Sequence, residues 1–168
     1  TSRSNTWTKG FSPFIIPGGY LYGNYYAKNV ENLWQFSKVY SEFVDDDGNP
    51  TLEYFKWAEK GWNDTYAHRY PMGIGSKPLY SYWDGQKYGY IEARKKIYIP
   101  IYCRGCIKTN AFKKLLEIYR ETNKDIYLID FDGYNHKEKN MTLSDVANNS
   151  KKSMGHAFCV YDLLQRYK

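Results

Sequence analysis

Apolar residues recur at helical spacing along much of the chain and predict most of its helices. Residues 30–43, which open with VENLWQF, predict the first helix. Thr51 is a suitable N-cap for a second helix, LEYFKWAEKGW, and Thr109 or Asn110 for a third, AFKKLLEIYRET. Two more helices are predicted near the end of the chain: TLSDVANN, whose Thr and Asp have capping-box spacing, and MGHAFCVYDLLQRY.

Alternating and aromatic-rich stretches predict a small sheet beside these helices. The sequence KIYIPIY (96–102) alternates, so a strand is the first prediction there, with Pro100 placing it at a sheet edge. A helix starting from YIEARKK is the alternative. DIYLIDFDGY (125–134) predicts a buried strand that ends in acidic residues, and Asp84-Gly85 predicts a hairpin turn. Residues 1–28, rich in Gly, Pro and aromatics, predict short strands or an ordered loop.

Together these elements predict a single α+β domain, helix-rich with a small β-sheet. It would span residues 1–168, with the segment 1–28 packed on it, because 168 residues suit one domain with a hydrophobic core. No run of about 18 apolar residues occurs, which argues against a membrane span. The start of the chain lacks the apolar core of a signal peptide. Three Cys, an odd number, indicate a reducing compartment, so we expect a cytoplasmic protein of a bacterial or phage-infected cell.

Charge and aromatic content narrow the range of partners. The net charge is +6, which favours anionic partners such as nucleotides or nucleic acid, although a solvated surface with a small Lys excess explains it equally well. Nineteen Tyr and five Trp provide side chains that pack in cores and also stack on flat ligands. We therefore expect a nucleotide or nucleic-acid substrate, no cofactor and no membrane partner, and the oligomeric state stays open.

Three polar residues of the first predicted helix, Glu31, Gln35 and Lys38, stand at positions i, i+4 and i+7. On a helix this spacing places all three on one face. Such a row is most often a solvated face. Here, however, Trp34 and Phe36 leave little of the helix purely polar, so the row is also a candidate to face a partner or a cleft.

The stretch VENLWQFSKVY resembles the signature helix of the NADAR (YbiA-like) superfamily. In that family a Glu, a Gln and a Lys occupy the positions of Glu31, Gln35 and Lys38. The segments TNAFKKLLEIYRETNKDIYLIDFDGY and MGHAFCVYDLLQRY are similar to the family's later helix–strand segment and to its closing helix. Two positions differ: Asn32 stands where the family often has His, and DFDGYN stands where an acidic strand is often followed by Trp-Gly.

This resemblance implies N-glycosidase chemistry, which is the hydrolysis of a bond between ribose C1 and a nitrogen. The substrate would be a phosphoribosyl-amine metabolite, or an ADP-ribosylated or modified base in DNA. Breaking the bond builds positive charge on the sugar, and a nearby carboxylate stabilises that charge or activates water. Glu31 would be that carboxylate, and Lys38 would hold an anionic group or orient Glu31. Asp130 and Asp132 are further catalytic candidates, with an ordinary Asp-Gly turn as the alternative.

The same interpretation assigns a set of substrate-binding residues. Gln35 would donate a hydrogen bond to the sugar, Arg69 would clamp a phosphate, and Trp83 would stack on a base. Asn32, Trp34 and Arg94 complete the predicted substrate-binding set. For Arg69, Trp83 and Arg94 the alternatives are an exposed loop, a core or sheet face, and a solvated face.

Cysteine and histidine spacing offers a weak alternative, a zinc site. Cys103 and Cys106 have C-x-x-C spacing, and His156 and Cys159 would complete a Cys₃His set. Because His156 and Cys159 lie three residues apart in an apolar helix, packing is the simpler interpretation, and we expect no metal.

Two other function classes also stay open. One is a non-catalytic nucleic-acid-binding protein that uses the same aromatic and basic side chains for stacking and phosphate contact. The other is an interaction or inhibitor protein of a phage or mobile element.

Overall fold

Helices make up most of the molecule, and short antiparallel strands lie beside them. The computed structural model describes residues 4–167. Its α-helices are α1 (Val30–Phe36), α2 (Leu52–Asn63), α3 (Tyr90–Ala93), α4 (Ile99–Cys106), α5 (Asn110–Glu121), α6 (Leu143–Asn148) and α7 (His156–Arg166). Its other helical turns are η1 (Trp7–Phe11), η2 (Ser41–Phe43), η4 (Lys137–Lys139) and the π-helical η3 (Arg94–Tyr98).

The strands form two small antiparallel sheets. In one, β1 (Gly19–Tyr20) pairs with β2 (Tyr26–Ala27). In the other, β4 (Tyr80–Trp83) lies between β3 (Lys38–Val39) and β5 (Gln86–Tyr88). The protein is therefore a single α+β domain with a small antiparallel sheet, as the sequence predicts. Within residues 4–167, no helix is long and apolar enough to cross a lipid bilayer.

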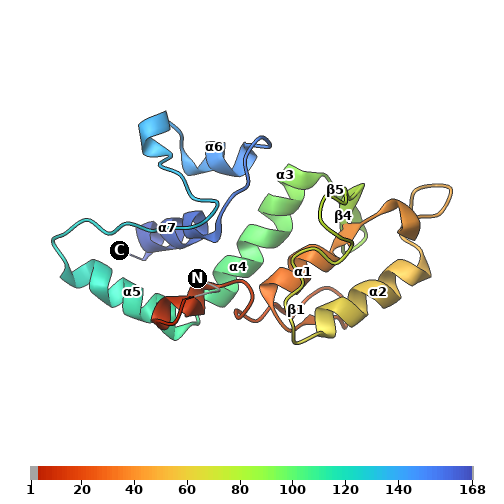
Figure 1. Ribbon diagram of the computed structural model, residues 1–168, viewed down its shortest axis with the longest axis horizontal. Helices are drawn as coiled ribbons and strands as arrows, with labels where there is room; N and C mark the ends of the chain where they lie inside the picture. The colour runs from red at the N-terminus through yellow and green to blue at the C-terminus, as the bar shows by residue number, and fades with distance from the viewer. Residues whose placement is uncertain (1–3, 168) are drawn as a thin grey trace.

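A central rod of α3, η3 and α4 runs diagonally through the molecule (Figure 1). In that view α1 and α2 lie on one side of the rod, and α5, α6 and α7 on the other. Ile97 and Tyr102 of the rod are fully buried. They belong to one hydrophobic core with Leu33 and Trp62 from one side and Cys159 from the other. The rod thus joins α1 and α7, the two helices that position the site described below.

Local capping explains why several helices begin where the sequence predicts. The side chain of Thr51 accepts a hydrogen bond from the backbone N–H of Tyr54, and Thr109 caps α5 in the same way. Thr142 and Asp145 form a complete capping box at the start of α6. The hairpin predicted at Asp84-Gly85 is also confirmed, since β4 and β5 flank this turn.

The first helix is shorter than predicted. The sequence predicts a helix over 30–43, but α1 ends at Phe36 and the chain continues into β3 and η2. The reason is a competing pairing: Lys38 and Val39 align with Ser81 and Tyr80 of β4. Lys38 therefore lies on a strand rather than on the helix.

The strand predicted at 96–102 is wrong, and the alternative helix is confirmed. Pro100 lies in the first turn of α4, directly after the π-helical η3, where the regular α-helical hydrogen bonding of the rod is interrupted. Ala93, Ile97 and Ile101 are all buried and stand four residues apart, which is a helical period.

The strand predicted at 125–134 is also wrong. Residues 123–135, which we call the strap, contain no helix or strand and run as an extended segment along α7 (Figure 1). Tyr127, Ile129 and Phe131 point outward with 81%, 90% and 90% of their surface exposed. Ile126 and Leu128 face inward against the core. Exposed and inward-facing side chains do alternate along the strap, but within residues 4–167 no strand pairs with it. Only one side of the strap is therefore packed against the protein.

Candidate functional site

The polar row of α1 forms a hydrogen-bonded chain. The Gln35 side-chain N–H donates to Glu31 Oε1 over 2.9 Å, and Lys38 Nζ donates to Gln35 Oε1 over 2.6 Å. The Lys38 ammonium also lies 5.1 Å from the centre of the Trp34 ring. Although α1 ends before Lys38, the lysine still reaches Gln35 from β3. The structure thus brings together four of the predicted site residues.

Burial shifts the pKa values of both charged groups in this row. Glu31 is only 7% exposed, and desolvation raises its pKa, against the opposing effects of the Gln35 hydrogen bond and the charges of Lys38 and Arg69. Burial lowers the pKa of Lys38 to about 8, against the opposing charge of Glu31. Both shifts bring the pKa of the group closer to neutral pH, the range that suits a group that transfers protons.

Aromatic rings connect this row with α7 through the central rod. The Trp34 ring lies 5.5 Å from Tyr98, Tyr98 stacks on Tyr102 at 6.0 Å, and Tyr102 lies 5.7 Å from His156. Burial raises the pKa of Tyr98 well above its usual value, and the Cys159 thiol and the carboxylates of Glu31 and Asp130 add to the rise. Tyr98 is therefore within electrostatic reach of carboxylates on both sides of the rod.

Asp130 forms the second half of the site, at the start of α7. Its Oδ2 accepts the backbone N–H of Ala157 over 3.1 Å and lies 3.2 Å from His156 Nδ1. The first turn of a helix favours a carboxylate in this position. Burial lowers the pKa of His156, and the charges of Asp130 and Asp132 oppose that shift. Asp130 and His156 are thus a fixed pair, and Asp132 stands near it.

Arg69 links the two halves from a third segment, the loop between α2 and β4. Its positive charge acts on the Glu31 carboxylate, whose pKa it lowers. Its guanidinium lies 5.9 Å from the Phe131 ring on the strap and 5.6 Å from Tyr70. The predicted phosphate clamp is therefore exposed and beside the polar row.

Asn32 makes structural contacts. It is fully buried, its side-chain N–H groups donate to the carbonyls of Asp64 and Tyr66, and its Oδ1 accepts from the His68 N–H. These bonds use both ends of the amide and hold the loop that leads to Arg69. These contacts favour a structural role for Asn32, and its substrate contact stays a prediction.

Arg94 is likewise a structural residue. It is 2% exposed and donates hydrogen bonds to the carbonyls of Val146, Ala147, Asn149 and Lys152. A further bond goes to the Tyr90 hydroxyl over 2.7 Å. The guanidinium therefore ties the C-terminal end of α6 to the rod, and these contacts favour a structural role over the predicted substrate contact.

Trp83 packs away from the polar row. Its ring lies 5.0 Å from Tyr22, which also contacts Trp62 and Tyr82. This aromatic cluster joins β4 to the segment between β1 and β2. The alternative that Trp83 belongs to a sheet face matches these contacts, and none of them involves the residues around Glu31.

The cysteines and His156 are not arranged as a zinc site. Cys103 and Cys159 share a hydrogen bond, Cys106 is paired with the Tyr102 hydroxyl, and His156 is paired with Asp130. Among residues 4–167, no group of three or more His, Cys, Asp or Glu side chains is placed to hold a metal ion. In the part of the chain that the structure describes, these contacts favour packing over the weak zinc alternative.

Two members of the site were missed from the sequence. Tyr98 was part of the wrongly predicted strand, so its place between the two halves could not be inferred. For His156 the sequence indicates packing or, as a weak alternative, metal binding, but it does not indicate a carboxylate partner. Its position at the start of the last helix, directly after Gly155, was the available signal, because a helix start favours a partner carboxylate.

Comparisons of the chain with protein-family models, curated proteins and solved structures found no match. The fold and site define an α+β domain with a buried carboxylate–amide–amine row on α1 and an Asp–His pair at the start of α7. The resemblance of α1 to the NADAR signature stays a prediction from its residues.

Proposed function

We propose that this protein is an N-glycosidase that hydrolyses a ribose C1–N bond in a nucleotide-type substrate. The observation that carries the proposal is the hydrogen-bonded row of Glu31, Gln35 and Lys38, in which a desolvated carboxylate is held by an amide next to an amine. The substrate is a phosphoribosyl-amine nucleotide, or an ADP-ribosylated or modified base in DNA.

The carboxylate of Glu31 supplies the central chemical step. Gln35 fixes one oxygen, Oε1, and among the described residues the other oxygen accepts no hydrogen bond. That oxygen is available to stabilise positive charge on the sugar, or to take a proton from the attacking water. The raised pKa of Glu31 makes it a better base than an exposed carboxylate.

The neighbouring charged groups would bind and orient the substrate. Lys38 and Arg69 are cations beside Glu31 and suit a phosphate or diphosphate. Asp130, held by His156 and the N-terminus of α7, is the second carboxylate across Tyr98. Glycosidic cleavage commonly uses two carboxyl groups with different roles, and this pair has different surroundings.

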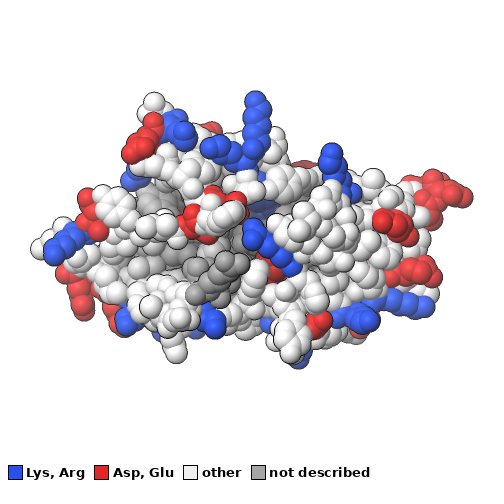
Figure 2. Space-filling model, in the orientation of Figure 1, with Lys and Arg blue, Asp and Glu red and all other residues white. Residues whose placement is uncertain are grey.

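The surface charge supports an anionic substrate. Figure 2 shows Lys and Arg side chains over the region of α6 and again near the middle of the same face, with Asp and Glu close to both groups and along both edges, including the edge beside the loop before α2. That acidic edge includes the exposed Asp45, Asp46 and Asp47. The net charge of +6 favours a phosphate-bearing partner, and the cations near the middle of this face are a place where it could bind.

The test is a product assay with wild-type protein and Glu31→Gln. Both are incubated with ADP-ribosylated DNA, DNA with modified bases and phosphoribosyl-amine nucleotides, and products are identified by mass spectrometry. Wild type should release a base or a ribose product, and Glu31→Gln should be slower by roughly 10²–10⁴-fold, the usual contribution of a general acid or base.

A matched control separates chemistry from folding. Glu53→Gln changes an exposed carboxylate of α2 and should keep full activity. Glu31→Gln should melt no lower than wild type, because it removes a buried charge and keeps a similar shape. A folded Glu31→Gln protein with full activity would overturn the proposal.

A second candidate, a non-catalytic nucleic-acid binder, is favoured by one observation. Tyr66, Tyr70 and Phe131 are 79%, 52% and 90% exposed on the segments around Arg69, where bases could stack on them. This function predicts binding to single-stranded DNA that weakens steeply with salt while no product forms from any substrate.

A further inference from the structure

A cavity of about 650 Å³ lies between the strap and α7, next to the proposed catalytic site. Asp130 and Ala157 border it, so the cavity begins where the Asp130–His156 half of the site ends. We call it the strap cavity. Its volume falls within the range of ordinary small-molecule sites, about 300–1,000 Å³.

Aromatic side chains form much of the wall of the strap cavity. Tyr134 packs 4.9 Å from Phe158, and His136 lies 5.7 Å from Phe158 and 5.3 Å from Tyr161. Across the cavity, Tyr127 of the strap is 81% exposed. The α7 side of the cavity is therefore already packed and presents aromatic rings to a flat ligand.

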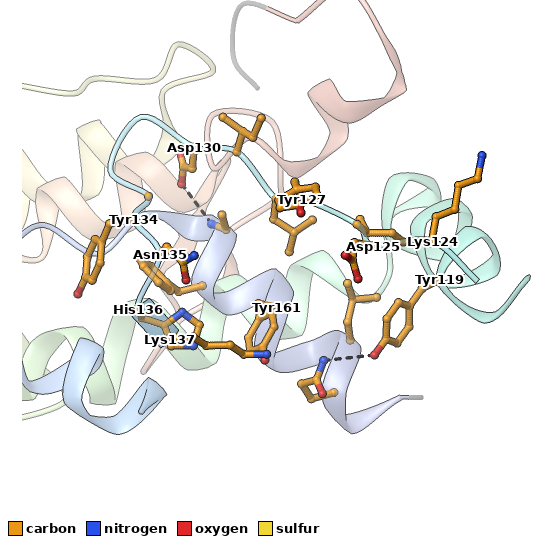
Figure 3. Close-up of a pocket in the computed structure, with 18 residues that line it drawn as sticks. Tyr119, Lys124, Asp125, Tyr127, Asp130, Tyr134, Asn135, His136, Lys137 and Tyr161 are labelled. Carbon is orange, nitrogen blue, oxygen red and sulfur yellow. Dashed lines mark hydrogen bonds between the residues drawn. The ribbon is translucent and has the colours of Figure 1, made fainter. Parts of the chain in front are cut away.

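A cationic side chain, Lys137, stands at one end of the cavity. Figure 3 shows His136 and Lys137 at one end, Lys124 and Asp125 at the other, and Tyr161 between them. The Lys137 ammonium lies 5.4 Å from the centre of the Tyr161 ring. Of the two carboxylates that border the cavity, Asp130 is already held by His156 and Ala157.

We propose that the strap cavity binds one nucleotide unit, with its base against the aromatic wall and its phosphate at Lys137. A base stacks on Tyr and His rings whatever its identity, and a lysine next to the stacking site matches the phosphate. The unit is a free nucleotide or one residue of a strand. The site is separate from the polar row and requires no catalysis there.

Calorimetric titration with AMP and with a single-stranded DNA 12-mer tests the proposal. Lys137→Ala should weaken binding of the favoured probe about tenfold, the loss expected for one charged hydrogen bond. Lys139→Ala is the matched control, because Lys139 is an exposed lysine of the same η4 turn and does not border the cavity. It should bind like wild type. Tyr161→Leu, which removes the stacking ring, should also weaken binding.

The two probes distinguish the two sources of the nucleotide. AMP binding as tight as that of the 12-mer identifies a free nucleotide, and tight binding of the 12-mer alone identifies a strand. Glu53→Gln, which changes an exposed carboxylate of α2 that does not border the cavity, should bind the same probe as tightly as wild type. The proposal is overturned if neither probe binds, or if Lys137→Ala and Lys139→Ala bind equally well. Either result leaves the glycosidase assay unaffected, so the two proposals fail independently.

Discussion

Replacing Arg94 with Met should destabilise the whole domain. The guanidinium donates to four backbone carbonyls and to the Tyr90 hydroxyl, and within residues 4–167 no carboxylate forms an ion pair with it. Three of those carbonyls belong to the C-terminal end of α6 and the residue after it, where a helix leaves its acceptors unpaired. Arg94 satisfies them and also places a positive charge where the helix dipole favours one.

The magnitude follows from what Arg94→Met leaves behind. Each buried carbonyl that loses its donor costs about 1–3 kcal/mol, and the bonds are not additive because the 149–152 segment can regain water. Removing one partner of a buried charged network costs about 3–5 kcal/mol, which we take as the expected loss. For a domain of this size each kcal/mol lowers Tm by about 2–4 °C, so a fall of roughly 6–20 °C is expected.

Thermal unfolding followed by circular dichroism measures this loss. Lys95→Met is the matched control, since Lys95 is the exposed neighbour and makes one surface hydrogen bond, to Asn148. It should stay within about 0.5 kcal/mol of wild type. Arg94→Lys should recover only part of the loss, because one ammonium cannot reproduce the guanidinium fork. If Arg94→Met melts with wild type and loses only substrate binding, the structural role is refuted and the sequence-based prediction for Arg94 is restored.

Two further predictions concern the candidate site. The pKa of Lys38 is about 8 in the folded protein and near 10.5 in the unfolded chain, so the folded protein loses the ammonium above about pH 8. Between pH 8 and 10.5 the unfolded chain binds more protons at this group, and the contribution of Lys38 to stability therefore rises with pH. The pH profile of kcat/KM should therefore fall above about 8, and the fall should disappear in Lys38→Arg; a profile that Lys38→Arg leaves unchanged excludes Lys38. A methyl group at Gly155 would overlap the Asp130 carboxylate, so Gly155→Ala should lose about 1–3 kcal/mol and most activity. Gly89→Ala, which meets open space, should lose neither, and equal unfolding curves for the two variants would contradict the packing argument.

The polar row could be predicted because its contacts are local. Glu31 and Gln35 are one helical turn apart, and Lys38 is three residues from Gln35. The row could be predicted even though the predicted end of the helix was wrong, because the Lys38 side chain is long enough to reach Gln35 from β3. The helix caps could be predicted for the same reason: Thr51 and Thr109 accept hydrogen bonds from backbone N–H groups three residues away.

The rod and the strap could not be predicted because distant residues decide them. KIYIPIY alternates like a strand, yet its buried positions also fit a helix, and only packing against α1 and α7 selects the helix. DIYLID has the composition of a buried strand, but no strand of the described chain lies beside it. Arg94 shows the same limit, since its four carbonyl partners lie more than 50 residues later.

The polar row is difficult to explain by stability alone. Burial moves the pKa of Glu31 up and that of Lys38 down, so both charged forms are less favourable in the folded protein than in water. Replacing a buried ionic pair by apolar residues is often neutral or stabilising, and the same helix already carries Leu33 and Phe36 in the core. A helix selected only to pack would therefore favour apolar residues at positions 31 and 35. A desolvated carboxylate held next to an amine is the arrangement that acid–base chemistry requires, which is why the glycosidase test begins with Glu31.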